Sequence, residues 1–336
     1  MFRRILAAAL LVALAALLVL AGWPQLLGLE RQPGVAQMVS LRGLAVLVGA
    51  ALVILFTLFS LMWPSSRRFT GAVALLFLAF SAVTVAVLAT RGFGDPAMQT
   101  KAGGDVTVLG WNTLGDAPGA DTIAALALEV DADVVVLPET SAETAGIAAA
   151  IMRESGHGMQ VLSLSLDEIS KARTTSLLIS DDLGRYQREE SAGTTPTLPS
   201  FVAVPADGTG PTIVAAHPVA PVPGEMAAWR DGLAWLADRC AGENVILAGD
   251  VNSTLDHYTG LSTDGGELGR CRDAARATGN AAVGTWPTSF PPLLGAPIDH
   301  VMATPDWQIA GFRVITSHDD DGSDHRPVVA LLRPTG

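Results

Sequence analysis

The sequence is poor in the residues and motifs that carry several common chemistries. It has only two cysteines among 336 residues, Cys240 and Cys271, and no His/Cys cluster at the spacing of a zinc site. It also contains no Walker loop, no GxSxG elbow and no HExxH pattern. These absences remove the usual markers of nucleotide-triphosphate switching, serine hydrolysis and zinc proteolysis.

Basic residues are scarce in the C-terminal two thirds of the chain. Residues 101–336 contain 14 Lys plus Arg against 31 Asp plus Glu, which gives a formal net charge of −17 with His neutral. Because contacts from Lys and Arg to phosphate dominate affinity for nucleic acids, this charge disfavours DNA or RNA as the main substrate. One cluster is dense enough to supply a local basic strip: Arg153, Lys171, Arg173, Arg185 and Arg188.

Apolar residues, by contrast, are abundant: they make up 49% of the chain, and the mean hydropathy is positive. The excess is concentrated in three nearly uncharged runs, at 5–22, 43–63 and 69–90. Each run is near the ~20 residues that a helix needs to span a bilayer. The predicted organisation is a membrane anchor of three transmembrane helices (1–92), a linker (93–104) and a globular domain (105–334).

The first run could also be a secretory signal peptide, because Arg3 and Arg4 precede its Ala/Leu-rich core. No convincing small-x-small cleavage site precedes Trp23 and Pro24, however, and two further apolar runs follow at once. A retained anchor is the simpler interpretation. The lipid bilayer is therefore a predicted partner of the chain.

Charges that flank the apolar runs predict the orientation, because positively charged loops resist crossing the membrane. The charged residues of one side are Arg3, Arg4, Arg67 and Arg68. Those of the other side are Glu30, Arg31, Arg42, Arg91 and Lys101. The modest bias favours a cytoplasmic N-terminus and, after three crossings, a C-terminal domain outside the cytoplasm. A cytoplasmic domain is the alternative.

The connector at 91–104 is rich in Gly and small polar residues, so we expect it to be a flexible tether. About 14 such residues have an r.m.s. span of roughly 20 Å. The globular domain would then stay close to the bilayer, and lipid headgroups or small phosphoesters near the membrane surface would be its reachable substrates.

The globular part alternates short β-rich runs with helical stretches. Some runs, such as Val134 to Leu137, are apolar throughout, which suits strands buried on both faces. Together these elements predict one layered α/β domain. The predicted strands are 106–112, 133–139, 174–180, 200–206, 212–218, 244–252, 298–304 and 326–332. The predicted helices are 121–130, 141–155, 225–240 and 267–277.

Two of the predicted helices carry further signals. Thr140 and Glu143 have the spacing of a capping box at the start of 141–155. In 225–240, Met226, Leu233 and Leu236 are predicted to lie on one face of the helix.

Most predicted strands end or begin in a residue that can bind a metal ion or phosphate. The residues are Asn112, Glu139, His217, Asp250 and Asn252 at strand ends, and Asp299, His300, Asp324 and His325 at strand starts. The ends of some strands and the starts of antiparallel ones meet at the same edge of a sheet, where sites commonly form. The pattern therefore predicts a single site at one sheet edge.

Each residue alone also has a purely structural interpretation. Asn112 could serve a turn, and Asp250 with Asn252 could form an Asx turn. Glu139 could cap the following helix, and His217 could be a buried histidine with satisfied hydrogen bonds. The repetition of the pattern at so many strand termini favours the site.

The chemistry that such a set supports is hydrolysis of a phosphate ester. Carboxylate and amide oxygens are hard ligands that suit Mg²⁺ or Mn²⁺. In-line attack on phosphate needs positive charge at the phosphoryl oxygens and a well-placed water. A divalent ion with a His side chain supplies the first requirement, and a carboxylate supplies the second.

The order of the motifs resembles a known family. The segments "GWN", "LPE", "AAHP", "GDVN", "PIDHV" and "GSDHRPV" follow one another between about Val106 and Leu332. They are similar to the endonuclease/exonuclease/phosphatase superfamily, the metal-dependent phosphoesterases related to deoxyribonuclease I. "GTWP" at 284–287 resembles the membrane-anchored bacterial branch. The resemblance implies a four-layer α/β sandwich of two packed mixed β-sheets with helices outside and the site at one edge.

The resemblance also implies the ligands of the metal ion. Glu139 is expected to be the principal ligand, assisted by Asn112, and Asp324 is expected to lie beside the ion. His300 also follows an Asp, but it is expected to be structural.

The remaining residues would then have catalytic roles. Asp250 is expected to position or deprotonate the attacking water, and Asn252 to hydrogen-bond the phosphate. His325 is expected to stabilise charge on the phosphoryl oxygens, with Asp299 orienting its ring. His217 is expected to contact phosphate or assist the leaving group.

The expected function is a phosphodiesterase or phosphatase in the bacterial cell membrane that depends on Mg²⁺ or Mn²⁺ and acts on a small molecule or a lipid headgroup. A nuclease for extracytoplasmic DNA or RNA is the first alternative, which the acidic charge disfavours. A catalytically inactive binding module is the second alternative, which the intact set of candidate ligands disfavours.

An extracytoplasmic domain could also hold a disulfide, because oxidising compartments preserve such bonds. Cys240 and Cys271 are the candidates. Two unpaired buried thiols are the alternative.

Overall fold

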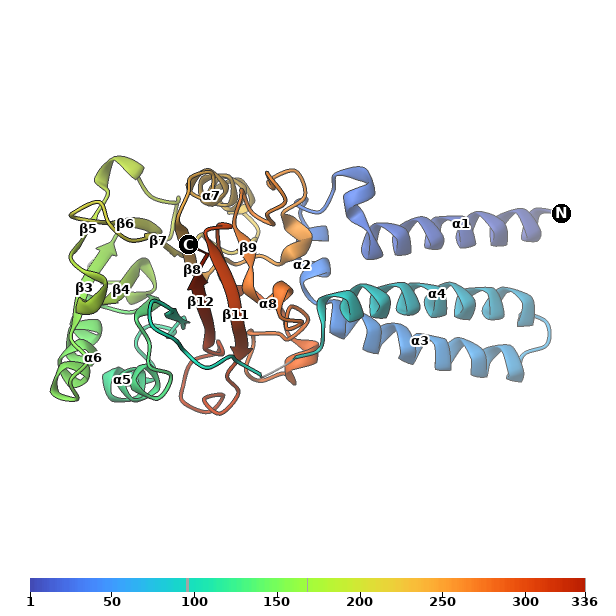
Figure 1. Cartoon of the computed structure of the whole chain (residues 1–336). Coiled ribbons are helices and arrows are strands. Elements are labelled where there is room, and N and C mark those ends of the chain that lie inside the picture. Colours follow the sequence, from blue (N-terminus) through green and yellow to red (C-terminus); the bar gives the residue numbers. More distant parts are fainter. Residues whose placement is uncertain (95–96, 168, 336) are drawn as a thin grey trace.

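A computed structural model describes residues 1–94, 97–167 and 169–335 (Figure 1). Three long helices project from one end of a layered α/β domain, and a short helix lies at the junction (Figure 1). The long helices are α1 Phe2–Gly22, α3 Arg42–Met62 and α4 Arg67–Arg91. The junction contains α2 Val35–Ser40 and the short 3-10 helix η1 Pro24–Leu27.

The three long helices confirm the predicted apolar runs and are long and apolar enough to cross a membrane. The N-terminus and the turn between α3 and α4 lie at the tip of the bundle that points away from the domain (Figure 1). The four arginines predicted for one side of the membrane, Arg3, Arg4, Arg67 and Arg68, belong to these two segments.

Two six-stranded mixed sheets form the domain, with the orders β11-β12-β1-β2-β4-β3 and β5-β6-β7-β8-β10-β9. In each sheet one central pair is parallel, β1 with β2 and β7 with β8, and the other neighbours are antiparallel. The first sheet contains β1 Val106–Gly110, β2 Val134–Pro138, β3 Met159–Ser165, β4 Thr174–Ser180, β11 Trp307–Val314 and β12 Val328–Pro334. The second contains β5 Tyr186–Arg188, β6 Phe201–Pro205, β7 Thr212–Ala216, β8 Val245–Asp250, β9 Arg272–Asp273 and β10 Asp299–Ala303.

Successive side chains of a strand point to opposite faces of its sheet, so each sheet has an inner and an outer face. The inner faces of the two sheets pack against each other. Val108 and Val136 of the first sheet share the inner core with Ile213 and Ile246 of the second. Helices α5 Gly119–Glu129 and α6 Ala142–Glu154 cover the outer face of the first sheet, and α7 Met226–Arg239 covers that of the second. The result is the predicted four-layer sandwich.

Every predicted strand is present, but β3, β5, β9 and β11 were not predicted. Two of these, β5 and β9, have only three and two residues, too few for a periodic pattern. In β11 the register shifts between Ile309 and Gly311, which interrupts the alternation. By contrast, β3 does alternate apolar and polar residues in "MQVLSLS" and could have been found.

The predicted helix at 267–277 is wrong, because the structure has only the short helix α8 Ala274–Ala277 there. The preceding Gly-rich stretch folds into turns, in which Gly266 N donates to Thr263 O and Thr263 N donates to Gly269 O. Cys271 lies at the end of these turns and forms a disulfide with Cys240, next to the C-terminus of α7.

The cap of α6 also differs from the prediction. Ser141, rather than Thr140, is the N-cap, and its side chain accepts a hydrogen bond from Thr144 N. Thr140 is buried instead and its hydroxyl lies 2.8 Å from that of Thr113, so it joins the β1 and β2 loops.

A buried ionic cluster joins the helical bundle to the domain. Asp256 of the domain accepts hydrogen bonds from Arg42 at the start of α3 (2.9 and 2.6 Å) and from Arg91 at the end of α4 (2.8 Å twice). All three side chains are buried. Burial alone would raise the pKa of Asp256, but the charges and hydrogen bonds of Arg91 and Arg42 outweigh it and hold the pKa far below its ordinary value.

The segment between α1 and α3 packs onto the domain as well. Ala36 of α2 is part of the apolar core beneath α7, and its carbonyl lies 3.1 Å from His257 Nε2. Gln37 donates a hydrogen bond to Pro221 O, and Arg31 donates to His257 O at 2.7 Å. The segment between α1 and α3 is therefore fixed to the domain at several points.

The expectation of a flexible connector is not met. Gly94 N donates to Gly279 O, and Gln99 N donates to Ala310 O along β11. Lys101 forms ion pairs with Asp131 and Asp133, both at 2.9 Å or less. Part of the predicted linker, residues 95–96, lies outside the described residues. The ordered contacts on both sides position the domain against the helices instead of letting it move on a tether.

Replacing Asp256 with Ala is expected to destabilise the full-length protein strongly, because two buried arginines would lose their counter-charge. Breaking a buried pair in this way costs about 3–5 kcal/mol, whereas an exposed pair contributes roughly 1 kcal/mol or less. The matched control is Asp264→Ala, which removes an exposed carboxylate 3.6 Å from Arg270. Thermal unfolding in detergent compares the two variants, and equal losses in melting temperature would refute the role of the cluster.

Candidate active site

Sheet topology brings the predicted residues to one edge. Strands β1 and β2 are parallel and end next to Asn112 and Glu139. Strand β12 is antiparallel to β1, so His325 precedes it at the same edge. In the second sheet β8 ends at Asp250 and the antiparallel β10 starts at Asp299, and these two residues are register partners. The sandwich places both edges side by side.

Asn112 links the two sheets through its side-chain amide. Its Nδ2 donates to Glu139 Oε1 and to Asp250 Oδ2, both at 3.0 Å. Its Oδ1 accepts a hydrogen bond from Leu114 N. The nitrogen end of the amide therefore faces the carboxylates, and Asn112 would ligate a metal ion through Oδ1 only if the two ends of the amide were exchanged.

The backbone at the site adopts uncommon conformations. Glu139 and Asn252 have φ angles of 56° and 49°, in the left-handed region that non-glycine residues rarely occupy. Gly249, just before Asp250, has φ of 132°, and a Cβ there would lie 2.2 Å from Ala216 O. Strained backbone of this kind clusters at functional sites. It aims Glu139, Asp250 and Asn252 into the same space.

Asp250 and Asn252 form the expected Asx turn and also belong to the site. Asn252 N donates to Asp250 Oδ1 at 2.9 Å, and Asn252 Nδ2 donates to Asp250 Oδ2 and to Pro218 O. The turn holds the Asp250 carboxylate beside Asn112. The structural and functional interpretations of "GDVN" are therefore compatible.

His325 lies between two carboxylates. Its Nδ1 is 2.9 Å from Asp299 Oδ2, and its Nε2 is 3.8 Å from Asp250 Oδ2. Burial would lower the pKa of His325, but the charges of Asp299 and Asp250 outweigh burial and raise it, so the imidazole is a cation. Burial raises the pKa of Asp250, Asp299 adds to the rise, and the positive charge of His325 opposes it.

The residues around His325 hold its motif in place. Ser323 Oγ donates to Asn112 O and accepts from His325 N. Trp111 Nε1 donates to His325 O at 3.0 Å. The buried Arg326 pairs with Asp319 and donates to carbonyl groups of the loop that carries Trp286. This accounts for three consecutive ionisable residues before a buried strand.

His217 is a further neighbour of Glu139. Its Nε2 is 3.8 Å from Glu139 Oε1 and has no hydrogen-bond partner among the described residues, although the side chain is fully buried. Burial, together with the charge of His325, lowers the pKa of His217 to about 3. His217 is therefore neutral near pH 7, and its approach to Glu139 is not an ion pair.

Asp324 completes the cluster at its exposed side. Its Oδ2 accepts a hydrogen bond from Trp286 Nε1 at 2.8 Å, and its Oδ1 lies 3.9 Å from His325 Nε2. Trp286 belongs to the "GTWP" segment that carried part of the family resemblance, but no role was predicted for it. His300, in contrast, bonds Asp273 and Ser253 O and is structural as expected.

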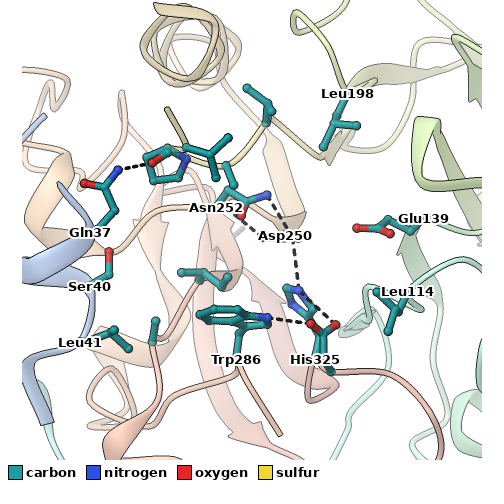
Figure 2. A pocket seen from close by; sticks show the side chains of 17 residues that line it. Gln37, Ser40, Leu41, Leu114, Glu139, Leu198, Asp250, Asn252, Trp286 and His325 are labelled. Atoms are coloured by element: carbon teal, nitrogen blue, oxygen red, sulfur yellow. Dashed lines mark hydrogen bonds and ion pairs between the residues drawn. The ribbon is translucent and has the colours of Figure 1, made fainter. Parts of the chain in front are cut away.

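A cavity of about 490 Å³ opens beside these residues (Figure 2). Glu139, Asp250 and His325 lie on one part of its wall. The opposite part comes from the anchor: Figure 2 shows Gln37, Ser40 and Leu41, from α2 and its C-cap, facing the site across the cavity. This contribution could not be predicted from the sequence, because it depends on how the segment between α1 and α3 docks on the domain.

The donor set fits a divalent cation. Three carboxylates, those of Asp250, Asp299 and Asp324, lie within 3.9 Å of the cationic His325, and a fourth, that of Glu139, borders the same cavity. Two of their oxygens, Asp299 Oδ1 and Asp324 Oδ1, are buried without a hydrogen-bond partner among the described residues. Burial also raises the pKa of Glu139. An additional positive charge would relieve this excess of negative charge.

One trio has the geometry of a metal site by distance alone. Within the described part of the chain, ligand atoms of Asp250, Asp299 and His325 lie within 4.8 Å of one another. However, the hydrogen bond between His325 and Asp299 already uses two of these three groups.

Comparison with known proteins places these observations in context. The family model described as "Endonuclease/Exonuclease/phosphatase family" matches residues 109–325. Members of this family generally depend on divalent metal ions. No curated protein matches the chain.

Solved structures of the same fold are similar over the domain. The endonuclease/exonuclease/phosphatase from Bacteroides vulgatus is 17% identical, with a TM-score of 0.51 over 68% of this chain and 99% of that chain. TDP2 from D. rerio, complexed with a single strand DNA product, is 15% identical, with a TM-score of 0.51 over 68% and 99%. The AP endonuclease LMAP from Leishmania major is 13% identical, with a TM-score of 0.52 over 74% and 94%. At these identities the likeness concerns the fold alone.

Proposed function

Because this chain belongs to the endonuclease/exonuclease/phosphatase family, we propose that it is a membrane-anchored, divalent-metal-dependent hydrolase that cleaves a phosphate ester of a small molecule or a lipid headgroup. The observation that carries the proposal is the convergence of Glu139, Asp250 and His325 at one sheet edge beside a cavity. Carboxylates and a cationic histidine are the groups that in-line attack of water on phosphate requires.

The proposed roles of the residues follow from their positions. Glu139 and Asp324 would hold Mg²⁺ or Mn²⁺, which supplies positive charge at the phosphoryl oxygens. Asn112 would join them as a ligand with the two ends of its amide exchanged, so that Oδ1 faces the carboxylates. Asp250 takes a proton from the attacking water, because its carboxylate borders the cavity next to the metal side. Its raised pKa brings it closer to the pH at which it must accept that proton.

Two histidines act on the phosphate. His325 is held as a cation by Asp299, so it donates from Nε2 to a phosphoryl oxygen and stabilises the charge that develops there. His217 is neutral and its Nε2 has no partner among the described residues, so it is available to the phosphate or the leaving group. Asn252 positions Asp250 and borders the cavity.

The domain is proposed to lie outside the cytoplasm of a bacterial cell. In the predicted orientation Arg42 and Arg91 lie on the domain side of the membrane, where their positive charge opposes an extracytoplasmic domain. Asp256 neutralises part of that charge. The arginines at the opposite tip of the bundle have no such partner among the acidic residues of the described ion pairs. This increases the charge bias toward a cytoplasmic tip.

A nuclease is the second candidate, because similar folds include TDP2 and an AP endonuclease. The candidate basic strip argues against it. Lys171 pairs with Asp116, and Arg173 lies 3.6 Å from Asp167. Arg188 pairs with Glu190 in the same way. Acidic neighbours thus compensate the cations that a polyanion would need.

The test is hydrolysis by the purified full-length protein with Mg²⁺ on plasmid DNA, RNA, phospholipids and simple phosphate esters. We expect esters or lipids to be cleaved faster than DNA, and DNA cleavage not to accelerate at low salt. The domain's repulsion of a polyanion grows as the Debye length rises from ~10 Å at 0.1 M to ~30 Å at 0.01 M. Efficient cleavage of duplex DNA that strengthens at low salt, and is lost on changing Lys171 and Arg173 to Ala, would favour the nuclease.

A further inference from the structure

We propose that the substrate is a membrane lipid phosphoester, whose phosphate lies at His325 and whose first apolar portion lies against α2 and residues 219–222. The inference rests on the proposed function and narrows its substrate class. It assigns a substrate-binding surface to a part of the chain outside the catalytic domain.

The cavity has two unlike walls. The catalytic side presents carboxylates and His325, whereas most of the remaining lining is apolar. The apolar lining residues are Leu41, Leu114, Leu198, Val219, Ala220, Pro221, Val222, Ala296 and Ile298. A small charged phosphoester has no group to place against such a wall. An amphipathic ester has a group for each wall: its phosphate suits the catalytic side, and its alkyl chain suits the apolar side.

The apolar wall adjoins the membrane. Ser40 and Leu41 line the cavity, and Arg42 is the first residue of α3, a helix of 21 residues able to cross a membrane. A helical residue advances the chain by about 1.5 Å, so the cavity lies within a few ångströms of the start of the span. A lipid headgroup at the bilayer surface would therefore be at the height of the site.

The domain meets the bilayer with apolar residues of its own. The 3-10 helix η6 Pro292–Leu294 packs on α3 so closely that a Cβ on Gly43 would lie 1.7 Å from Leu293 O. The side chains of Leu293 and of Phe290 just before η6 are 45% and 38% exposed. Exposed large apolar side chains beside a transmembrane helix suit contact with lipid.

The wall contributed by α2 is held in place. Ala36 is buried in the core beneath α7, Gln37 bonds Pro221 O, and Arg42 is clamped to Asp256. These contacts fix α2 beside residues 219–222, so that both belong to the same apolar wall of the cavity. Leu41 is therefore a specificity-determining residue, and the anchor does more than tether the domain.

A chain-length series tests the proposal with the full-length protein in detergent. The substrates are p-nitrophenyl phosphodiesters with methyl, butyl and octyl groups, and the readout is kcat/KM. Each buried methylene contributes about 0.8 kcal/mol, a factor of about 4, so the octyl ester is expected to exceed the methyl ester by at least tenfold. Leu41→Asn and Val222→Asn should reduce this octyl-to-methyl ratio severalfold. Ile147→Asn, on the exposed face of α6 far from the bundle, is the matched control and should keep the wild-type ratio.

The source of the ester is tested in nanodiscs. The wild-type protein is reconstituted with phosphatidylcholine, phosphatidylglycerol and phosphatidic acid, and mass spectrometry follows the released products. We expect one of these lipids to be hydrolysed. A chain-length preference without lipid hydrolysis would indicate a soluble apolar ester and overturn the lipid assignment.

Two further results separate this inference from the proposed function. Hydrolysis of all three diesters without a chain-length preference, or with a preference that Leu41→Asn and Val222→Asn leave intact, would overturn the inference alone. Failure to hydrolyse any diester or lipid with Mg²⁺ present would overturn the proposed function and the inference with it.

Discussion

Replacing Asp250 with Asn is expected to lower kcat for phosphoester hydrolysis by about a thousandfold, because a positioned general base contributes roughly 10²–10⁴-fold. The Asn side chain keeps an oxygen that can accept from Asn252 N, as Asp250 Oδ1 does. It cannot accept a proton from water. Steady-state kinetics on a simple phosphodiester measure the change, and thermal unfolding in detergent checks that the variant is folded.

The matched control for this substitution is Asp264→Asn, an exposed carboxylate outside the described site. It should leave kcat within twofold of the wild type, as surface substitutions generally do. His325→Ala should resemble Asp250→Asn, because one donor to a charged transition state is worth roughly 10²–10³-fold in kcat. A folded Asp250→Asn variant with kcat near that of the wild type would remove Asp250 from the mechanism.

Removal of divalent ions is expected to reduce hydrolysis to background, and Mg²⁺ or Mn²⁺ should restore it. The physical reason is the excess of carboxylates at the site: three of them, Asp250, Asp299 and Asp324, lie within 3.9 Å of the cationic His325, and Glu139 borders the same cavity. Without a divalent ion this set would repel a phosphate. The measurement is the rate on one phosphodiester after chelation, and after dialysis into buffers that contain each metal.

Two controls make the chelation result specific. Circular dichroism before and after chelation should be unchanged, because the described core is held by apolar packing and the disulfide between Cys240 and Cys271. Ca²⁺ should substitute poorly, since it prefers more ligands at longer distances than Mg²⁺. Full hydrolysis in rigorously metal-free buffer would contradict the account.

The sequence allowed the meeting of these polar residues at one sheet edge to be predicted, for a physical reason. Polar residues that end buried strands, such as Asn112 after β1 and Asp250 in β8, must meet where parallel and antiparallel strands share an edge. The structure accordingly links all eight predicted site residues through a continuous chain of contacts, from His217 and Glu139 to Asp299 and Asp324.

The features that could not be predicted from the sequence depend on tertiary contacts. The stretch before α8 lacks helix because its glycines and the disulfide at Cys271 favour turns. The role of α2 could not be predicted, since its residues Gln37 and Ser40 line the cavity only because the segment between α1 and α3 docks on the domain. Asp256 likewise gave no signal, because its two arginine partners lie 214 and 165 residues away in the sequence.

The central claim is that Glu139 holds a catalytic divalent ion at this sheet edge, and direct metal binding tests it without reference to any substrate. Electron paramagnetic resonance of Mn²⁺ added to the full-length protein should show one bound ion per chain. Glu139→Gln should weaken that binding at least tenfold, whereas Glu143→Gln on the neighbouring helix α6 should leave it unchanged. Absence of a bound ion in the wild type, or equal Mn²⁺ affinity in wild type and Glu139→Gln, would contradict the account.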